Sequence, residues 1–273
     1  MERSLLIVAV NFNATQDTIE FVYSLSKLEK INQARVIIVE NSNQISRDTE
    51  LKLNLLRFLP ELDFVETQEN CNYFGSVNYA INQLALNLMS FDFFIISNVD
   101  ILIKDSTFLS KLFSFDNPKV GVIAPTVFSL AQNKDQNPYK RLQFKKSYFY
   151  YYRIVYHHIF FTRMHEALAD ILRPYKNNNN ASSSNSEFIY APHGAFIIFL
   201  KSYFKAGCSI DYGKLLFCEE FFVSQQCANK GLRVFYEPAL KVLHSEHIAT
   251  GKLTGDYLRS IKLKSIKHFL KNF

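Results

Sequence analysis

Short apolar runs alternate with helical stretches from residue 5 to about residue 125, and this alternation constrains the fold most. We expect buried strands at Leu5–Val10, Val36–Val39, Phe64–Thr67, Phe93–Ile96 and Val120–Ile123. Two intervening helices are predicted by apolar residues at helical spacing: Ile19, Val22 and Leu25, with Asn13 or Thr15 as N-cap, and then Val77, Ile81, Leu84, Ala85 and Leu88. Strands that alternate with helices predict parallel βαβ units, packed as a three-layer α/β domain with a mostly parallel central sheet.

The middle of the chain departs from this alternation. Within residues 130–187 we predict a helix from Tyr148 to Leu172, and then a polar tract from Asn177 to Ser186. This Asn/Ser tract has too little apolar surface to order itself, so we interpret it as a mobile loop.

The pattern of strands and helices resumes after this segment. Strands are predicted at Ala195–Phe199, Arg233–Tyr236 and Val242–Leu243, and a helix at Glu219–Asn229 with Gly231 just beyond its end. We therefore expect one domain over residues 1–250 that carries an insertion at 130–187, followed by a basic amphipathic helix at 251–273.

Composition narrows the class of protein. Of the 273 residues, 48% are hydrophobic, which excludes a chain that is disordered as a whole. No run approaches the roughly 20 apolar residues of a membrane span, so we do not expect an integral membrane protein. The first ten residues lack the features of a signal peptide and the four cysteines have no CxxC spacing, so we expect a reduced, cytoplasmic protein.

The charge is mildly basic, with 31 Lys and Arg against 25 Asp and Glu. One basic group is followed directly by an aromatic cluster: Lys140, Arg141, Lys145 and Lys146, and then Tyr148, Phe149, Tyr150, Tyr151, Tyr152, Tyr156, Phe160 and Phe161. Such a segment could stack single-stranded bases, lie in a lipid headgroup layer, or form a helix buried against the main domain. The three interpretations stay open at the level of sequence.

Three groups of residues could carry chemistry. Asp100 ends the segment Ser97-Asn98-Val99-Asp100, which directly follows the strand at 93–96 at an edge where parallel sheets bind ligands. Its carboxylate could hold Mg²⁺ or Mn²⁺, or simply cap a turn. Glu219 and Glu220 begin a helix among apolar neighbours, where a carboxylate could act as a general base or only favour the helix dipole. His244 follows a strand, and on its own it is more often a surface or core residue than a metal ligand.

In this order the segments resemble the inverting family 2 glycosyltransferases with the GT-A (Rossmann-like) fold, particularly their rhamnosyltransferase-like members. The resemblance extends from Leu5 to about His244, except for residues 130–187. The matching segments are Val10-Asn11-Phe12-Asn13, Val39-Glu40-Asn41-Ser42, Asn70-Cys71-Asn72-Tyr73-Phe74-Gly75 with Asn78, Asn98-Val99-Asp100, His193-Gly194-Ala195, Glu219-Glu220, and Arg233 to Pro238 with His244.

The resemblance implies a sugar transfer with inversion from a nucleoside diphosphate donor, dTDP or UDP, in the synthesis of bacterial surface polysaccharides such as capsule or lipopolysaccharide, with rhamnose a candidate sugar. Glu220 falls on the catalytic base beside Glu219, Asp100 and His244 fall on the metal site, and His193 and Gly194 on the acceptor side. The donor-binding positions would be Asn11, Phe12, Asn13, Glu40, Asn41, Asn70, Gly75, Asn78 and Asn98.

The sequence departs from the family pattern at three of these positions. Asn98 replaces an acidic residue, and Glu40 and Glu220 each stand where the family has Asp, which lengthens the side chain by one methylene. A catalytically inactive glycosyltransferase-like binding protein is therefore one alternative, and a single-stranded nucleic-acid-binding protein is the other. The ordered motifs favour the enzyme, for which no nucleic-acid partner is expected.

The implied acceptor is a glycan on a lipid carrier. The predicted helix at 251–273 bears on this, because it interleaves apolar and basic residues: Leu258, Ile261, Ile266, Phe269 and Phe273 with Arg259, Lys262, Lys264, Lys267 and Lys271. Such a helix could lie peripherally on the anionic inner face of a membrane, or dock on the domain with a solvated basic face. The sequence leaves both interpretations open, as it does the oligomeric state.

Overall fold

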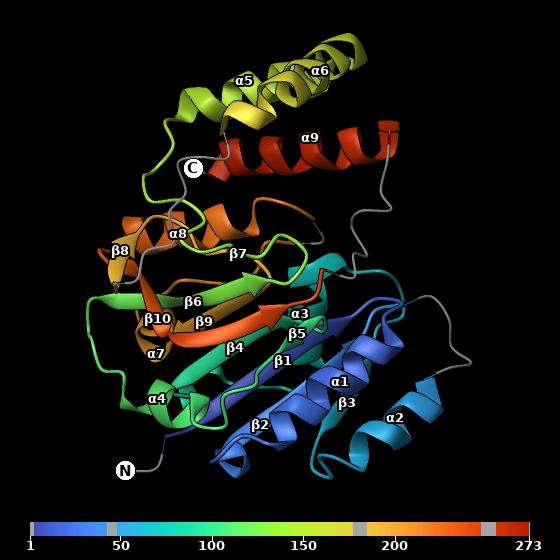
Figure 1. Cartoon of the computed structure of the whole chain (residues 1–273), viewed down its shortest axis with the longest axis vertical. Helices are drawn as coiled ribbons and strands as arrows, with labels where there is room; N and C mark the ends of the chain where they lie inside the picture. The colour runs from blue at the N-terminus through green and yellow to red at the C-terminus, as the bar shows by residue number, and fades with distance from the viewer. Residues whose placement is uncertain (1–2, 43–47, 177–184, 214, 247–254, 273) are drawn as a thin grey trace.

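The alternating first part of the chain builds the parallel half of one sheet (Figure 1). The computed structural model describes residues 3–42, 48–176, 185–213, 215–246 and 255–272. Strands β3, β2, β1 and β4 lie side by side in that order and run parallel to one another. In chain order the elements are β1 (Leu5–Asn11), α1 (Thr15–Ser26), the 3-10 turn Ile31–Gln33, β2 (Ala34–Glu40), α2 (Asp48–Leu56), β3 (Asp63–Glu66), α3 (Asn72–Gln83), the 3-10 turn Leu88–Ser90 and β4 (Phe93–Asn98).

The second half of the sheet is mixed. Strand β9 runs antiparallel to both of its neighbours, β4 and β6, whereas β6 and β10 are parallel. Short strands β5, β7 and β8 add antiparallel pairs at this side. The elements are β5 (Ile101–Leu102), α4 (Phe108–Ser114), β6 (Val120–Ser129), β7 (Lys134–Asp135), β8 (Glu187–Ile189), β9 (Phe196–Leu200), α7 (Lys201–Lys205), α8 (Glu219–Asn229) and β10 (Arg233–His244).

Both faces of the sheet are covered, as the three-layer prediction requires. Alternate residues of β1 enter different cores: Leu5 and Ile7 pack under α1, α2 and α4, while Leu6 and Val8 pack with α3, α7 and α8. This follows from the two-residue period of a strand, which sends successive side chains to opposite faces. The expected three-layer α/β class is thereby confirmed.

The insertion and the C-terminal segment form a separate helical layer above α8 (Figure 1). It contains α5 (Lys146–His157), α6 (Ile159–Lys176) and α9 (Gly255–Asn272). The single helix predicted from Tyr148 to Leu172 was wrong, because His158 has an extended backbone (φ −118°, ψ 129°) that separates α5 from α6. Of the predicted mobile tract, residues 177–184 lie outside the described residues. None of the described helices is long and apolar enough to cross a membrane.

The C-terminal helix docks on the rest of the protein. Ile266 and Phe269 of α9 are buried in one apolar cluster with Phe149 of α5 and Phe221 of α8. The rings of Phe149 and Phe269 lie 4.3 Å apart between centroids. The apolar stripe of α9 therefore faces protein, and the prediction of a buried aromatic helix also holds for Phe149.

Several local predictions needed correction. Helix α1 begins after Ala14, not after Asn13 or Thr15, and the Asn11 Oδ1 atom accepts the Ala14 N–H at 2.9 Å. Helix α3 ends at Gln83, so the last three residues of its predicted apolar face lie beyond it. The two strands expected at 233–236 and 242–243 form one strand, β10, whose register against β6 shifts between Glu237 and Lys241.

The end of α8 was predicted correctly. Gly231 has a positive φ of 71°, and the Leu232 N–H donates to the Cys227 carbonyl at 2.8 Å. This is the Schellman arrangement, in which a left-handed residue closes the last helical turn. Glycine adopts that conformation without the steric cost that a Cβ brings.

Candidate active site

A buried polar network joins the carboxyl ends of β1, β2 and β3. The Asn11 Nδ2 atom donates to Glu40 Oε2, and Glu40 Oε1 accepts the backbone N–H of Ser42 at 2.8 Å. The Asn41 Nδ2 atom donates to Asn70 Oδ1 at 2.9 Å, and Asn41 Oδ1 accepts the Cys71 N–H at 2.9 Å. Asn11, Glu40 and Asn41 are each at most 3% exposed, so the motifs predicted for the donor pocket meet in one place.

The other residues predicted to contact the donor lie around this network or on neighbouring elements. Asn13 has a positive φ of 56°, and its N–H donates to Ser42 Oγ at 2.8 Å. Phe12 follows β1 and is half-buried, and Gly75 is buried inside α3. Asn78 of α3 donates to the Ile210 carbonyl at 3.0 Å, so this amide supports the 210 loop. Asn98 ends β4, and its N–H donates to the Ala195 carbonyl at 2.9 Å.

Asp100 and His244 face each other across the end of the sheet. Asp100 follows β4 and His244 ends β10, and Asp100 Oδ2 lies 3.3 Å from His244 Nε2. Both side chains are about nine-tenths buried. Asp100 Oδ1 is buried and has no hydrogen-bond partner among the described residues.

Gln136 fixes the orientation of the His244 ring through Nδ1, the ring nitrogen that does not face Asp100. Gln136 Nε2 donates to Glu246 Oε1 at 2.5 Å, which turns the Gln136 carbonyl oxygen towards His244. That oxygen lies 2.7 Å from His244 Nδ1, so Nδ1 carries the proton. A neutral His244 then presents the lone pair of Nε2 to the Asp100 carboxylate. Two acceptors that face each other at 3.3 Å require a proton or a cation between them.

These two residues fit a divalent metal. No group of three or more His, Cys, Asp or Glu that could hold a metal exists within the described ranges. Asp100 and His244 would therefore supply two ligands, with the rest coming from a bound molecule or water, as Mg²⁺ and Mn²⁺ sites that hold substrate phosphates commonly do. The orphaned Asp100 Oδ1 atom supports this interpretation, because a buried carboxylate oxygen without a partner is costly.

The carboxylate pair begins α8 in a strained turn. Phe217 and Cys218 precede the helix with positive φ values of 76° and 69°, a conformation that non-glycine residues adopt at a cost of roughly 1–3 kcal/mol. Burial, followed by repulsion from Glu220, raises the pKa of Glu219 to about 8. Burial also raises the pKa of Glu220, opposed by a hydrogen bond from Tyr139 and the charge of Lys140. Burial thus disfavours the charged form of both carboxyl groups, and at Glu220 the hydrogen bond from Tyr139 opposes this effect.

The predicted acceptor-side residues lie against Glu220. A Cβ placed on Gly194 would lie 3.9 Å from Glu220 Oε2. The His193 N–H donates to Asn137 Oδ1 at 2.8 Å, and the rings of His193 and His244 lie 5.8 Å apart between centroids. Burial, together with His244, lowers the pKa of His193 to about 4, so its imidazole is neutral at physiological pH. The residues predicted for the acceptor side and for the metal therefore lie beside each other.

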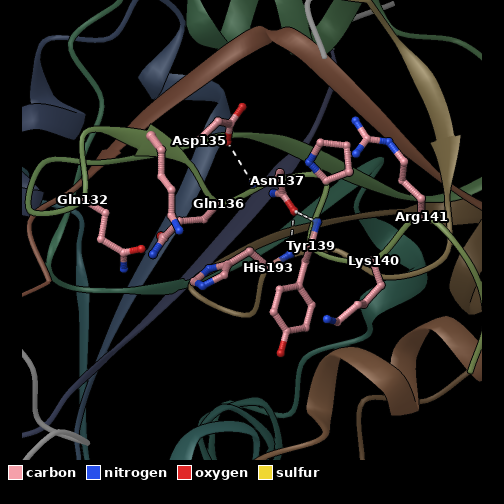
Figure 2. Close-up of a pocket in the computed structure, with 10 residues that line it drawn as sticks. Gln132, Asp135, Gln136, Asn137, Tyr139, Lys140, Arg141 and His193 are labelled. Atoms are coloured by element: carbon pink, nitrogen blue, oxygen red, sulfur yellow. Dashed lines mark hydrogen bonds between the residues drawn. The ribbon is translucent and has the colours of Figure 1, made fainter. Parts of the chain in front are cut away.

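A pocket of about 230 Å³ opens beside these residues (Figure 2). In Figure 2 the His193 and Tyr139 rings lie next to each other. The Asn137 Oδ1 atom accepts hydrogen bonds from the backbone N–H groups of both residues. Lys140 and Arg141 come from the same strand-like segment and line the pocket. The beginning of the insertion thus forms a wall of the candidate site.

Tyr73 completes the site from the other side. Its hydroxyl oxygen is buried without a hydrogen-bond partner among the described residues, and so is Glu219 Oε1. Burial raises the pKa of Tyr73, and the charges of Glu219 and then Asp100 raise it further. Within the described chain, the buried side-chain polar atoms that have no partner are therefore Tyr73 Oη, Asp100 Oδ1 and Glu219 Oε1, all in this site.

Sequence reasoning missed Tyr73, Gln136, Asn137 and Tyr139 as site residues. The available signal for Tyr73 was its place inside the motif Asn70-Cys71-Asn72-Tyr73-Phe74-Gly75. Gln136, Asn137 and Tyr139 belong to the 130–187 segment, which was set apart as an insertion. Only the pairing of β7 with β6 shows that this segment turns back over the end of the sheet.

Comparisons with known proteins place the fold. No protein-family model matches the chain, and no curated protein sequence is significantly similar to it. Solved structures do match. A mannosyltransferase from Pyrobaculum calidifontis, in complex with GDP-mannose and Mn²⁺, superposes with a TM-score of 0.57 at 11% identity, over 99% of this chain and 70% of that one.

Two further structures match over most of this chain and a smaller part of their own. GalNAc-T7 with UDP, GalNAc and Mn²⁺ gives a TM-score of 0.62 at 12% identity, over 97% of this chain and 48% of that one. S. aureus TarS (residues 1–349) with UDP-GlcNAc gives 0.56 at 11% identity, over 94% and 61%. The chain thus spans about half to two thirds of these two structures. At such low identity the likeness establishes architecture alone, and the chain has the GT-A fold of glycosyltransferases.

Proposed function

We propose that the protein transfers a sugar from a nucleoside diphosphate donor to a glycan acceptor. The observation that carries the proposal is the convergence of Tyr73 Oη, Asp100 Oδ1 and Glu219 Oε1, all buried and without partners, beside His244 and Glu220. Unpaired buried polar atoms are rare in folded proteins, and a cluster of them indicates that a polar ligand belongs there. The cluster lies beyond the carboxyl ends of the strands, where α/β sheets bind ligands.

The donor nucleoside would lie on the polar network of Asn11, Glu40, Asn41 and Asn70. This network is rigid and carries a buried carboxylate that can accept from a ribose or base. Similarly folded enzymes were solved with GDP-mannose, UDP-GlcNAc or UDP, which supports a sugar nucleotide. We propose UDP or dTDP as the carrier, on the motif resemblance, with rhamnose among the candidate sugars.

Asp100 and His244 would hold a Mg²⁺ or Mn²⁺ ion together with oxygens of the diphosphate. Such an ion neutralises the charge that builds on the diphosphate as it leaves. Gln136 keeps the His244 ring in the tautomer that offers Nε2 to a metal. Two of the similarly folded structures, the mannosyltransferase and GalNAc-T7, were determined with Mn²⁺.

Glu220 would be the general base in an inverting transfer. Its carboxylate would take the proton of an acceptor hydroxyl as that oxygen attacks the anomeric carbon from the face opposite the diphosphate. A pKa raised by burial brings a carboxyl group closer to the operating pH, which strengthens it as a base. Tyr139 orients the carboxylate through its hydrogen bond, and Glu219, kept protonated, adds no second negative charge.

The acceptor would enter over His193 and Gly194. Gly194 has no side chain to obstruct a hydroxyl that approaches Glu220, and the neutral His193 can hydrogen-bond a sugar. We propose a lipid-linked glycan of a bacterial surface polysaccharide as the acceptor, which follows the motif resemblance. The pocket lined by Tyr139, Lys140 and Arg141 is open on this side and has room for part of a sugar chain.

The test is Glu220→Gln, which keeps the size of the side chain and removes its basicity. We expect kcat for transfer to fall by about 10²-fold or more, with nucleotide affinity unchanged. The matched control is Glu237→Gln, because Glu237 lies in β10 with its carboxylate bound to Ser186 outside the site. Near-normal turnover by Glu220→Gln would remove Glu220 from this role.

A further inference from the structure

Helix α6 lies in the outermost layer of the molecule (Figure 1) and exposes an apolar stripe. Phe160, Met164 and Leu168 recur every four residues, so they lie on one side of the helix. They are 69%, 48% and 51% exposed. Thr162 points the other way, since it is buried and its hydroxyl donates to the Val155 carbonyl at 2.8 Å. The helix therefore packs on α5 through its polar side and presents its apolar side outward.

The neighbouring helix also exposes large apolar side chains. Tyr150, Tyr151 and Ile154 of α5 are each at least half exposed, and Phe161 of α6 is also exposed. We name this set, with Phe160, Met164 and Leu168, the α5–α6 face. A run of large exposed apolar side chains on one surface is uncommon for a protein that stays in water, and such surfaces mark interaction sites.

The charges around the α5–α6 face are mainly basic. Arg153 and Arg163 are exposed on the two helices, and Lys145 and Lys146 are exposed where α5 begins. No ion pair within the described residues involves Arg153 or Arg163. Glu166 is the exposed acidic side chain of the described part of α6. An apolar helix face with basic and tyrosine side chains at its margins matches the chemistry of an anionic lipid surface.

The same charges argue against a second copy of the chain as the occupant. A twofold contact through the α5–α6 face would bring each arginine near its own counterpart or the other basic groups, because such an interface pairs one surface with itself. An anionic bilayer would instead attract every one of them.

We propose that the α5–α6 face docks the protein on an anionic membrane surface. The apolar stripe of α6 inserts among the headgroups, and the basic side chains contact the lipid phosphates. This relocates the membrane contact from the C-terminal helix, whose Ile266 and Phe269 side chains are buried against α5 and α8. The proposal goes beyond the transfer reaction and does not depend on it, since docking needs neither donor nor metal.

The experiment is flotation of the full-length protein with vesicles of phosphatidylglycerol and phosphatidylcholine, compared with phosphatidylcholine alone. The variant is Phe160→Ser/Met164→Ser/Leu168→Ser. Its control is Leu53→Ser/Met89→Ser, which removes two apolar side chains that are 58% and 51% exposed on α2 and on the 3-10 turn before β4. A second variant, Arg153→Gln/Arg163→Gln, tests the charges.

We expect the wild type and the control to float with the anionic vesicles at low salt. The triple serine variant should lose at least about a hundredfold in partition coefficient, because each buried apolar side chain contributes on the order of tenfold. The double glutamine variant should lose about fivefold per charge, and this loss should vanish at high salt. Unchanged melting temperatures and nucleotide binding would show that the variants are folded.

Three results would overturn the proposal. They are absence of the wild type from anionic vesicles, wild-type flotation by the triple serine variant, and a wild-type dimer that this variant converts to a monomer. The last result would assign the α5–α6 face to contact between copies. In each case nucleotide binding by the same samples would still report on the proposed function separately.

Discussion

At the scale of single residues, the candidate site depends on polar atoms that the chain buries without giving them partners. Tyr73 Oη, Asp100 Oδ1 and Glu219 Oε1 come from α3, from the turn after β4 and from the start of α8. Leaving one such atom unpaired costs about 1–3 kcal/mol of stability. A sequence selected for stability alone would place Phe at 73 and an apolar residue at 219. Under the proposed function, the bound substrate would supply the missing partners.

The Tyr73→Phe variant tests separately how the hydroxyl affects stability and how it affects transfer. Removing the hydroxyl eliminates an unpaired buried oxygen, so we expect the variant to be as stable as the wild type or more stable by about 1 kcal/mol. We also expect kcat/KM for transfer to fall by about tenfold, because the transition state loses the stabilisation that a hydrogen bond from this hydroxyl provides. Thermal unfolding and steady-state kinetics measure the two effects.

Tyr79→Phe on the same helix is the control for this pair of measurements, since the Tyr79 side chain packs at the margin of the core. If Tyr73→Phe loses stability and keeps full activity, the hydroxyl has a packing role only, and Tyr73 is not a functional residue of the site.

Glu219 makes stability depend on pH in a direction opposite to that of a salt-bridged carboxylate. Its pKa is raised from its ordinary 4.5 to about 8 by burial and by Glu220. The folded chain therefore binds this proton more tightly than the unfolded chain, and the free energy of unfolding falls as the pH rises from 4.5 towards 8.

Glu219→Gln removes this titration. The melting temperature of the variant should therefore rise relative to that of the wild type as the pH increases from 4.5 towards 8. Differential scanning calorimetry at several pH values measures the gap. A gap that stays constant or shrinks with pH would contradict a raised pKa at Glu219.

At the scale of elements, α9 packs against α8, the helix that begins with Glu219 and Glu220. Phe269 is 4% exposed, and its ring contacts Phe149 of α5 and Phe221 of α8. Phe221 follows Glu220 directly, so the packing of α9 helps to fix the start of α8.

Phe269→Ala should cost about 3–5 kcal/mol for the lost burial and the cavity it leaves. Denaturant unfolding measures this, and faster proteolysis of the helical layer should accompany it. Tyr257→Ala on the same helix is the control, because Tyr257 is 63% exposed and its removal should be nearly neutral. A Phe269→Ala variant as stable as the wild type would show that α9 is not docked in solution.

The sequence predicted the elements whose signals are local. Strands β1, β2, β3, β4 and β9 and helix α8 lie within two residues of their expected bounds, because buried strands are continuous apolar runs and Gly231 marks the end of a helix. The antiparallel direction of β9 was not predictable from its composition, because a buried apolar run is compatible with a parallel or an antiparallel strand. The break between α5 and α6 at His158 carries no glycine or proline signal.

The candidate site was predictable where motifs lie at strand ends. Asn11, Glu40 and Asn41 follow neighbouring parallel strands, which brings them together at one edge. Asp100 and His244 meet for a different reason. Strand β10 crosses from residue 233 and pairs with β5, placing His244 opposite Ile101. Such a long-range register cannot be read from the sequence, nor can the return of Gln136 and Tyr139 over the sheet.

At the scale of the whole molecule, α9 lies between α8, which begins with Glu219 and Glu220 of the candidate site, and the layer of α5 and α6 (Figure 1). The sheet and its flanking helices form the GT-A body, and the helical layer lies above α8. Docking through this layer would leave the pocket lined by Tyr139 and His193 on the body of the protein.

The central claim is that the convergent polar atoms bind a nucleoside diphosphate with a divalent metal. The most direct measurement is the melting temperature with UDP, dTDP, GDP or ADP, each with and without Mn²⁺, for the wild type and for Asp100→Asn. A ligand at about 100 times its Kd adds about 2.7 kcal/mol, which shifts the melting temperature of a chain of this size by several degrees. We predict a shift with UDP or dTDP that Mn²⁺ enlarges, and loss of the Mn²⁺-dependent part in Asp100→Asn. No shift with any of the four nucleotides, with or without Mn²⁺, would contradict the account.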